Sequence, residues 1–170
     1  MIYPPELLDR LESYGREKWT GDPWRHVLGE REPIRFNTLG ARWNPPEIPA
    51  LYASLERTTA LAEGDYLLSL QSVRPTVKRR LVKLSVELRK VINLTHDRLA
   101  QVGVGSSELQ SIDHTACQLV GGAAAWLDCD GILVPSTRAP GTNVVVFALN
   151  RDISDALDVV ESEIIRAENR

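Results

Sequence analysis

Apolar residues recur along this chain with two different periods, one typical of helices and the other of strands. Near the N-terminus, leucines at helical spacing follow Pro4-Pro5-Glu6, which predicts a helix over residues 4–14. Near the other end, residues 152–168 carry apolar side chains at helical spacing and predict a closing amphipathic helix: Ile153, Leu157, Val160, Ile164 and Ile165. Two helices are therefore expected to flank the body of the chain.

Strands are predicted in the body of the chain from alternating and continuous apolar runs. Between residues 82 and 89, apolar and polar residues alternate strictly, which marks a half-buried strand, and residues 91–94 extend it. The basic run Lys78-Arg79-Arg80 resembles a phosphate-binding patch, but a strand of this kind usually carries such charges on its solvated face. Short apolar runs predict further strands. One begins at Trp24, and the others cover residues 50–53, 132–135 and 143–149.

Further helices are predicted between these strands. Thr58 or Thr59 is expected to cap a helix that carries Glu63, and Thr95 to cap a brief one. A longer helical region begins at Ser106 and ends at Asp130-Gly131. The small residues 121–125 within it suit close packing against a sheet, and they lack the spaced glycines and the lysine of a phosphate-cradling loop.

Composition narrows the class of protein. With 170 residues, 43% of them apolar and 25% charged, the chain is expected to form a single globular domain over residues 1–170. The net charge of −3 argues against direct binding of nucleic acid, because such affinity depends on basic surface. No apolar stretch is long enough to cross a bilayer and no secretory signal opens the chain, so we expect a cytoplasmic protein.

The cysteines and histidines indicate neither a disulfide nor a metal centre. Cys117 and Cys129 lie in an apolar, Ala-rich stretch, where a thiol usually acts as a small buried hydrophobe in a reducing compartment. His26, His96 and His114 have no metal-ligand spacing with one another or with the cysteines, so no metal site is expected.

The candidate chemistry concentrates in residues 38–63. Arg42, Tyr52 and Glu63 place a cation, an aromatic ring and a carboxylate on this stretch, and Asn44-Pro45-Pro46 stiffens the loop between the first two. A stiff loop followed by a buried strand and a helix is a common support for polar groups at the mouth of a pocket. The alternative is an ordinary turn whose charges face water.

One serine adds a second candidate position. Ser136 lies at the end of a predicted strand, where it is either a hydrogen-bonding group for a ligand or a local turn former. No His–acid pair accompanies it at a recognisable spacing, so the sequence does not indicate a hydrolase-type nucleophile.

Six blocks of sequence between about residues 24 and 150 resemble the RES-domain family, which is named for a characteristic arginine, glutamate and serine. Each block alone is weak, and the likeness is carried by the ordered set: Trp24-Arg25, Gly40-Ala-Arg42-Trp-Asn44-Pro-Pro, Ala50-Leu-Tyr52, Ala60-Leu-Ala-Glu63, Leu133-Val-Pro-Ser136 and Asn143-Val-Val-Val-Phe147. Members of this family are toxins of bacterial toxin–antitoxin pairs. Two departures, Ala41 where a second glycine is frequent and Glu47 where glycine is common, fall in the loop and spare the reacting groups.

The resemblance implies a single α+β domain similar to diphtheria-toxin-like ADP-ribosyltransferases, with small mixed or antiparallel sheets flanked by helices. It also implies an enzyme that degrades NAD, and a partner antitoxin with an Xre-type helix-turn-helix domain. Nucleic acid would be contacted only through that antitoxin, and a homodimer would form within the complex. Carried over residue by residue, the site consists of Arg25, Arg42, Tyr52, Glu63 and Ser136.

These side chains suit cleavage of the bond between nicotinamide and ribose, which passes through an oxocarbenium-like ribose. The carboxylate of Glu63 would stabilise the positive charge that grows on the ribose. The cationic nicotinamide ring would lie on the face of Tyr52, a cation–π contact of about 0.5–2 kcal/mol. Arg42 and Arg25 would bind the diphosphate, because a planar guanidinium matches phosphate oxygens, and Ser136 would add a hydroxyl. The set needs no metal.

Three functions are compatible with these residues. The first is a toxin that destroys NAD, by hydrolysis or by phosphorolysis, and so arrests growth. The second is an enzyme that transfers ADP-ribose to a host protein, which shares the first half of the chemistry. The third is a non-catalytic partner of a DNA-binding antitoxin. The residues do not distinguish water, phosphate and a protein side chain as the acceptor of ADP-ribose.

Overall fold

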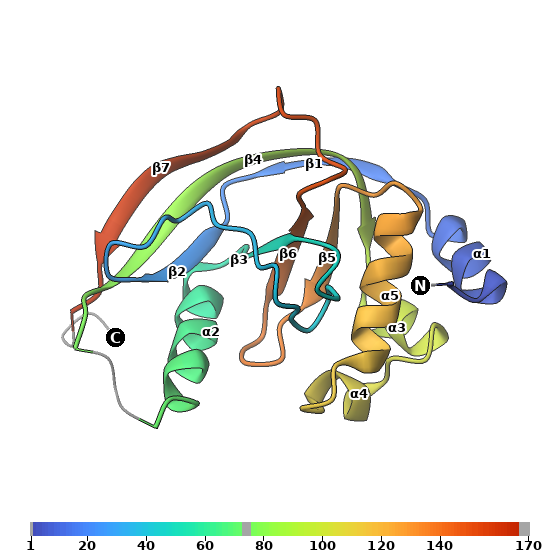
Figure 1. The fold of residues 1–170 in the computed structure, drawn as a ribbon, viewed down its shortest axis with the longest axis horizontal. Helices are drawn as coiled ribbons and strands as arrows, with labels where there is room; N and C mark the ends of the chain where they lie inside the picture. Colours follow the sequence, from blue (N-terminus) through green and yellow to red (C-terminus); the bar gives the residue numbers. More distant parts are fainter. Residues whose placement is uncertain (1, 73–75, 167–170) are drawn as a thin grey trace.

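The fold was analysed in a computed structural model, which describes residues 2–72 and 76–166. Figure 1 shows a strongly bent sheet with helix α2 on one flank and helices α1, α3, α4 and α5 on the other. This architecture confirms the predicted α+β class. The strands join in one seven-stranded sheet, in which all pairs are antiparallel except β4 with β5.

The described residues contain five helices and seven strands. The helices are α1 (Pro5–Ser13), α2 (Arg57–Ser69), α3 (His96–Gln101), α4 (Ser106–Gln110) and α5 (Thr115–Trp126). The strands are β1 (Glu17–Gly21), β2 (Trp24–Leu28), β3 (Ala50–Ser54), β4 (Arg79–Asn93), β5 (Gly131–Pro135), β6 (Thr142–Phe147) and β7 (Leu157–Ile164). None of these helices is long and apolar enough to cross a membrane.

Strand β4 organises the sheet. It pairs along one edge with β2 and β1, and along the other with β7 and, at its end, β5. Because β2 also pairs with β3, β3 with β6 and β6 with β5, the hydrogen bonds close a circuit that returns to β4. The predicted long strand is therefore correct, and its length lets one element border both ends of the circuit (Figure 1).

The predicted closing helix over residues 152–168 is wrong as far as residue 166, and its last two positions lie outside the described residues. Leu157–Ile164 is a strand, β7, that runs antiparallel to β4 with Val86 opposite Leu157 and Arg80 opposite Ile164. Its apolar side chains other than Leu157 remain at the surface, with Val160 56% exposed, so a helix here would have had little core face to bury. The free backbone groups along the edge of β4 decide the conformation instead, since pairing satisfies them.

Three local predictions at the helices have mixed outcomes. Helix α1 confirms the predicted N-terminal helix, and the Thr95 side chain accepts a hydrogen bond from the backbone N–H of Arg98, which confirms that cap. Helix α2 begins two or three residues earlier than predicted, after Glu56, and Thr59 is buried within its first turn. The long helical region from Ser106 divides into α4 and α5.

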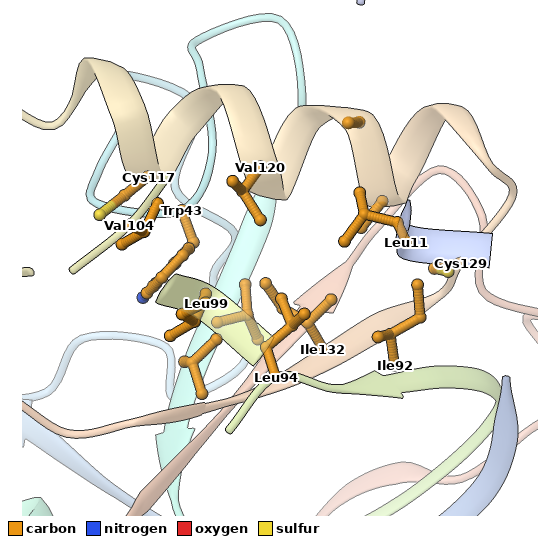
Figure 2. Packing of buried hydrophobic residues seen from close by; sticks show 14 of the residues in the cluster. Leu11, Trp43, Ile92, Leu94, Leu99, Val104, Cys117, Val120, Cys129 and Ile132 are labelled. Carbon is orange, nitrogen blue, oxygen red and sulfur yellow. The ribbon is translucent and has the colours of Figure 1, made fainter. Parts of the chain in front are cut away.

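Two hydrophobic cores lie on the two sides of the inner strands. The first is formed by α1, α3, α4 and α5 against the ends of the strands, and it includes the buried indole of Trp43 (Figure 2). The buried residues of the second come entirely from β2, β3, β4 and β6. Cys117 and Cys129 are fully buried as free thiols, which confirms the prediction that both are core residues.

The alternating faces of β3 and β6 explain how the sheet presents its polar residues. Leu51 and Val146 point into the second core, whereas Ala50 and Phe147 face the first. Tyr52 lies two positions after Ala50 and therefore on the same face. Asn143 lies four positions before Phe147 and also shares this face. The face that packs against helices at one end of these strands is therefore polar at the other end, where α2 approaches it.

Close packing of α5 fixes the loop before β3. A Cβ atom on Gly121 would lie 1.9 Å from the carbonyl oxygen of Trp43, so only glycine allows this approach. A Cβ atom on Gly122 would lie 2.3 Å from the hydroxyl oxygen of Tyr3. The two glycines of α5 thus pack against the loop and the N-terminal segment, and Ala123 and Ala124 share the first core with residues of β4, β5 and β6, which agrees with the predicted packing against the sheet.

Candidate active site

A cavity of about 420 Å³, here called the first cavity, opens between β2, β3, α2 and the loop before β3. Arg25, Arg42, Tyr52 and Glu63 all line it. Ser136 lies at its border, where its hydroxyl contacts Glu63. The fold thus brings together all five residues that the sequence singled out, although they are spread over more than a hundred positions of the chain.

Glu63 projects from α2 and is held through one of its two oxygens. Its Oε1 accepts hydrogen bonds from the hydroxyl of Ser136 (2.7 Å) and from the side-chain amide of Asn143 (2.8 Å). Among the described residues, no hydrogen bond reaches Oε2. The protein therefore fixes the orientation of the carboxylate and leaves one oxygen for a ligand in the cavity.

Asn143 is a site residue that the sequence analysis missed. The Ser54 hydroxyl donates to the Asn143 carbonyl oxygen Oδ1 at 2.7 Å, which turns the amide nitrogen toward Glu63. Ser54 and Asn143 are direct partners in the β3–β6 register. In the sequence, Asn143 only opens an apolar run, so its role becomes visible once the two strands are paired.

Tyr52 is tied to the stiff loop that precedes it. Its hydroxyl donates to the side-chain oxygen of Asn44 (2.7 Å) and accepts from the backbone N–H of Trp43 (2.9 Å). Asn44 is fully buried, and its amide donates to the backbone carbonyl of Ile48 at 2.8 Å. Burial raises the pKa of the Tyr52 phenol above its ordinary value, so the ring stays neutral at physiological pH.

The two arginines of the predicted site are anchored through backbone carbonyls. The Arg42 guanidinium donates to the carbonyl oxygens of Leu109 and Ser111, which ties the loop to the end of α4. Arg25 donates to the carbonyl of Tyr52 at 2.6 Å. Its Nε is buried without a hydrogen-bond partner among the described residues, and burial lowers the pKa of this guanidinium. Both side chains keep N–H groups for a ligand.

A histidine of the cavity wall is held neutral. His26 accepts a hydrogen bond at Nε2 from the guanidinium Nε of Arg79 at 2.9 Å. Burial and the positive charge of Arg79 lower the pKa of this imidazole to about 4. The ring also fills the space beside Gly64, because a Cβ atom there would lie 2.3 Å from it. His26 therefore sets how closely α2, which carries Glu63, approaches β2.

The wall of the cavity also contains an arginine–aromatic pair. The Arg138 guanidinium lies 3.3 Å from the centre of the Tyr66 ring, and both residues line the cavity. Within residues 2–72 and 76–166, no group of three or more His, Cys, Asp and Glu side chains is placed to hold a metal ion. Hydrogen-bond donors, one carboxylate and aromatic faces are thus the chemical groups that the cavity offers.

Comparison with known proteins gives a consistent set of relatives. The family model described as the RES domain matches residues 8–166. Proteins named NAD(+) phosphorylase MbcT, from Mycobacterium bovis and Mycobacterium tuberculosis, are 28% identical over 153 residues, which cover 84% of this chain and 80% of theirs. A chain in the crystal structure of the M. tuberculosis MbcT–MbcA toxin–antitoxin complex is 25% identical, with a TM-score of 0.84 over 95% of this chain and 93% of that one.

Proposed function

This chain belongs to the RES-domain family, and from that premise we propose that it is a toxin that cleaves the nicotinamide–ribose bond of NAD. The observation that carries the proposal is the geometry of Glu63, which lines the cavity: its Oε1 is held by Ser136 and Asn143, and its Oε2 has no hydrogen-bond partner among the described residues. The similarity to proteins named NAD(+) phosphorylase supports it.

Glu63 would act on the ribose of the bound dinucleotide. As the bond from C1′ to the pyridinium nitrogen breaks, its electron pair moves to the nitrogen and neutral nicotinamide leaves. Positive charge then builds on the ribose, and a fixed carboxylate stabilises it more than a mobile one, since no reorientation is needed. The two donors on Oε1 supply that fixation, and Oε2 remains for the ribose hydroxyls.

The remaining predicted residues would position the substrate. The face of Tyr52 would hold the cationic nicotinamide ring, because its phenol is fixed by the loop and stays uncharged. Arg42 lines the same cavity and would bind anionic groups near the reacting ribose. Ser136 acts through Glu63, to which it donates its hydroxyl, so its proposed role is to position the carboxylate.

Inorganic phosphate is the acceptor that we propose, because the curated relatives are named NAD(+) phosphorylase. A phosphate oxygen would form a bond to C1′ on the face opposite the departing nicotinamide, so that ADP-ribose 1″-phosphate and nicotinamide are the products. Incubation of the purified protein with NAD, with and without phosphate, tests this. Release of nicotinamide only with phosphate is expected, whereas equal release in both buffers would indicate hydrolysis.

We further propose that an antitoxin with an Xre-type helix-turn-helix domain silences this enzyme in the cytoplasm, within a complex that includes a toxin homodimer. The similarity to a chain from a toxin–antitoxin complex supports a partner of this kind. Exposed aliphatic side chains at the cavity rim, Leu67, Leu70 and the 92% exposed Ile112, offer an apolar contact surface. Addition of the antitoxin should abolish nicotinamide release, and undiminished release from a stable complex would contradict this proposal.

A further inference from the structure

A second cavity, of about 500 Å³, adjoins the first. It is enclosed by β2, the segment that follows β2 and the last turns of α2. Four residues belong to the walls of both cavities: Arg25, His26, Asn37 and Leu67. The two cavities thus meet at these side chains, and a ligand that occupied both would contact them.

The second cavity is positively charged in a chain whose net charge is −3. Arg25, Arg31 and Arg35 line it, against a single carboxylate, Glu32, among the residues of its wall. Arg25 lies at the junction of the two cavities, and its buried Nε lacks a hydrogen-bond partner in the described part of the chain. Its other nitrogens donate to backbone carbonyls and it forms no ion pair among the described residues, so an anionic ligand beside it would supply the opposite charge that it lacks.

Apolar side chains complete the second cavity. Phe36 and Leu67 form part of its wall, and Leu39 beside them is 87% exposed. Guanidinium groups next to aromatic and aliphatic surface suit a ligand that joins a phosphate to a flat apolar ring. Arg42, by contrast, lines the first cavity and is absent from the second.

We infer that the second cavity binds the adenosine diphosphate half of the dinucleotide, an assignment that rests on the proposed cleavage of NAD. Arg25 binds the diphosphate at the junction, Arg31 and Arg35 neutralise it from the loop, and the adenine lies against Phe36 and Leu39. The nicotinamide riboside then reaches into the first cavity toward Glu63. This assignment moves the diphosphate away from Arg42, where the sequence analysis had placed it together with Arg25.

The binding of ADP, which lacks nicotinamide and its ribose, tests the assignment directly. Titration calorimetry compares the wild type with the double variant R31Q/R35Q, which keeps polar side chains of similar length and leaves intact the backbone carbonyls of both residues that accept hydrogen bonds. We expect the Kd for ADP to rise about tenfold or more, because each lost charge removes a phosphate contact. Arg10→Gln on the distant helix α1 is the control and should leave the Kd unchanged.

Steady-state kinetics with NAD separates this assignment from the alternatives. The double variant should raise the KM for NAD more than it lowers kcat, because the lost contacts are remote from the breaking bond. If the double variant raises the KM for phosphate and leaves the KM for NAD unchanged, the second cavity binds the phosphate acceptor, and the inference is overturned. An unchanged Kd for ADP in R31Q/R35Q, or no ADP binding by the wild type, would also overturn it. If ADP binds as expected but NAD stays intact, the assignment stands and the proposed cleavage fails.

Discussion

Two hydrogen-bond donors converge on one oxygen of Glu63, and one of them has no reactivity of its own. Ser54 orients the Asn143 side chain across the β3–β6 pair, and the Asn143 amide donates a hydrogen bond to the carboxylate. Its contribution is positional, because a carboxylate that swings freely loses the alignment on which charge stabilisation depends.

Substitution of Asn143 by alanine should lower the kcat for nicotinamide release by about a hundredfold while the KM for NAD changes little, since misplacement of a catalytic group by about 1 Å has such an effect. Asn150→Ala is a matched control. The Asn150 amide donates to the carbonyls of Ala125 and Cys129, far from Glu63, so its loss should lower the melting temperature and spare kcat. Equal kcat in wild type and Asn143→Ala would show that Ser136 alone suffices to hold Glu63.

At the scale of elements, the distance between α2 and β2 determines where Glu63 lies. Gly64 sits directly against the neutral imidazole of His26, which is itself fixed by the guanidinium of Arg79. Gly64 and His26 are in contact because α2 and β2 cross at this point, where the packing leaves no space for another atom. Any side chain at position 64 would separate the two elements.

Gly64→Ala should therefore impair both stability and activity, although alanine is normally the better helix former by about 1 kcal/mol. The added Cβ would overlap with the His26 ring, so α2 must shift and carry Glu63 with it. Thr58→Ala, at an exposed position of the same helix, should leave the melting temperature equal or slightly higher. A Gly64→Ala protein as stable and active as the wild type would show that α2 is not fixed by this contact.

The local pattern of apolar and polar residues predicted most helices and strands. It failed where the conformation or the start of an element depends on residues far away in the sequence. Strict alternation identified β4, because its side chains face two environments along its whole length. The periodicity of residues 152–168 fits a helix equally well, and only the unpaired edge of β4, some seventy positions earlier, selects a strand. The start of α2 was misplaced for a similar reason. The Thr59 hydroxyl donates to the carbonyl of Pro140 and thus does not cap the helix.

At the scale of the whole molecule, the closed circuit of strands creates the site. The circuit brings β2, β3 and β6 together, and α2 then covers their polar ends, so Arg25, Tyr52, Asn143 and Glu63 meet around one cavity. The ordered motifs of the RES-domain family predicted all five residues of the candidate site. Asn143 belongs to one of these motifs, but its contact with Glu63 could not be predicted, nor could the second cavity, because both depend on contacts between segments that no single motif contains.

The account depends on Glu63 as the group that eases the departure of nicotinamide, and one measurement tests it most directly. Nicotinamide release from NAD in the presence of phosphate is compared between the wild type and Glu63→Gln, which keeps the volume and one carbonyl oxygen of the side chain but removes its charge. Glu87→Gln, at an exposed position of β4, is the matched control. The account predicts that release falls to background in Glu63→Gln, with an unchanged circular dichroism spectrum, and stays at the wild-type rate in Glu87→Gln. Full release by a folded Glu63→Gln protein would contradict it.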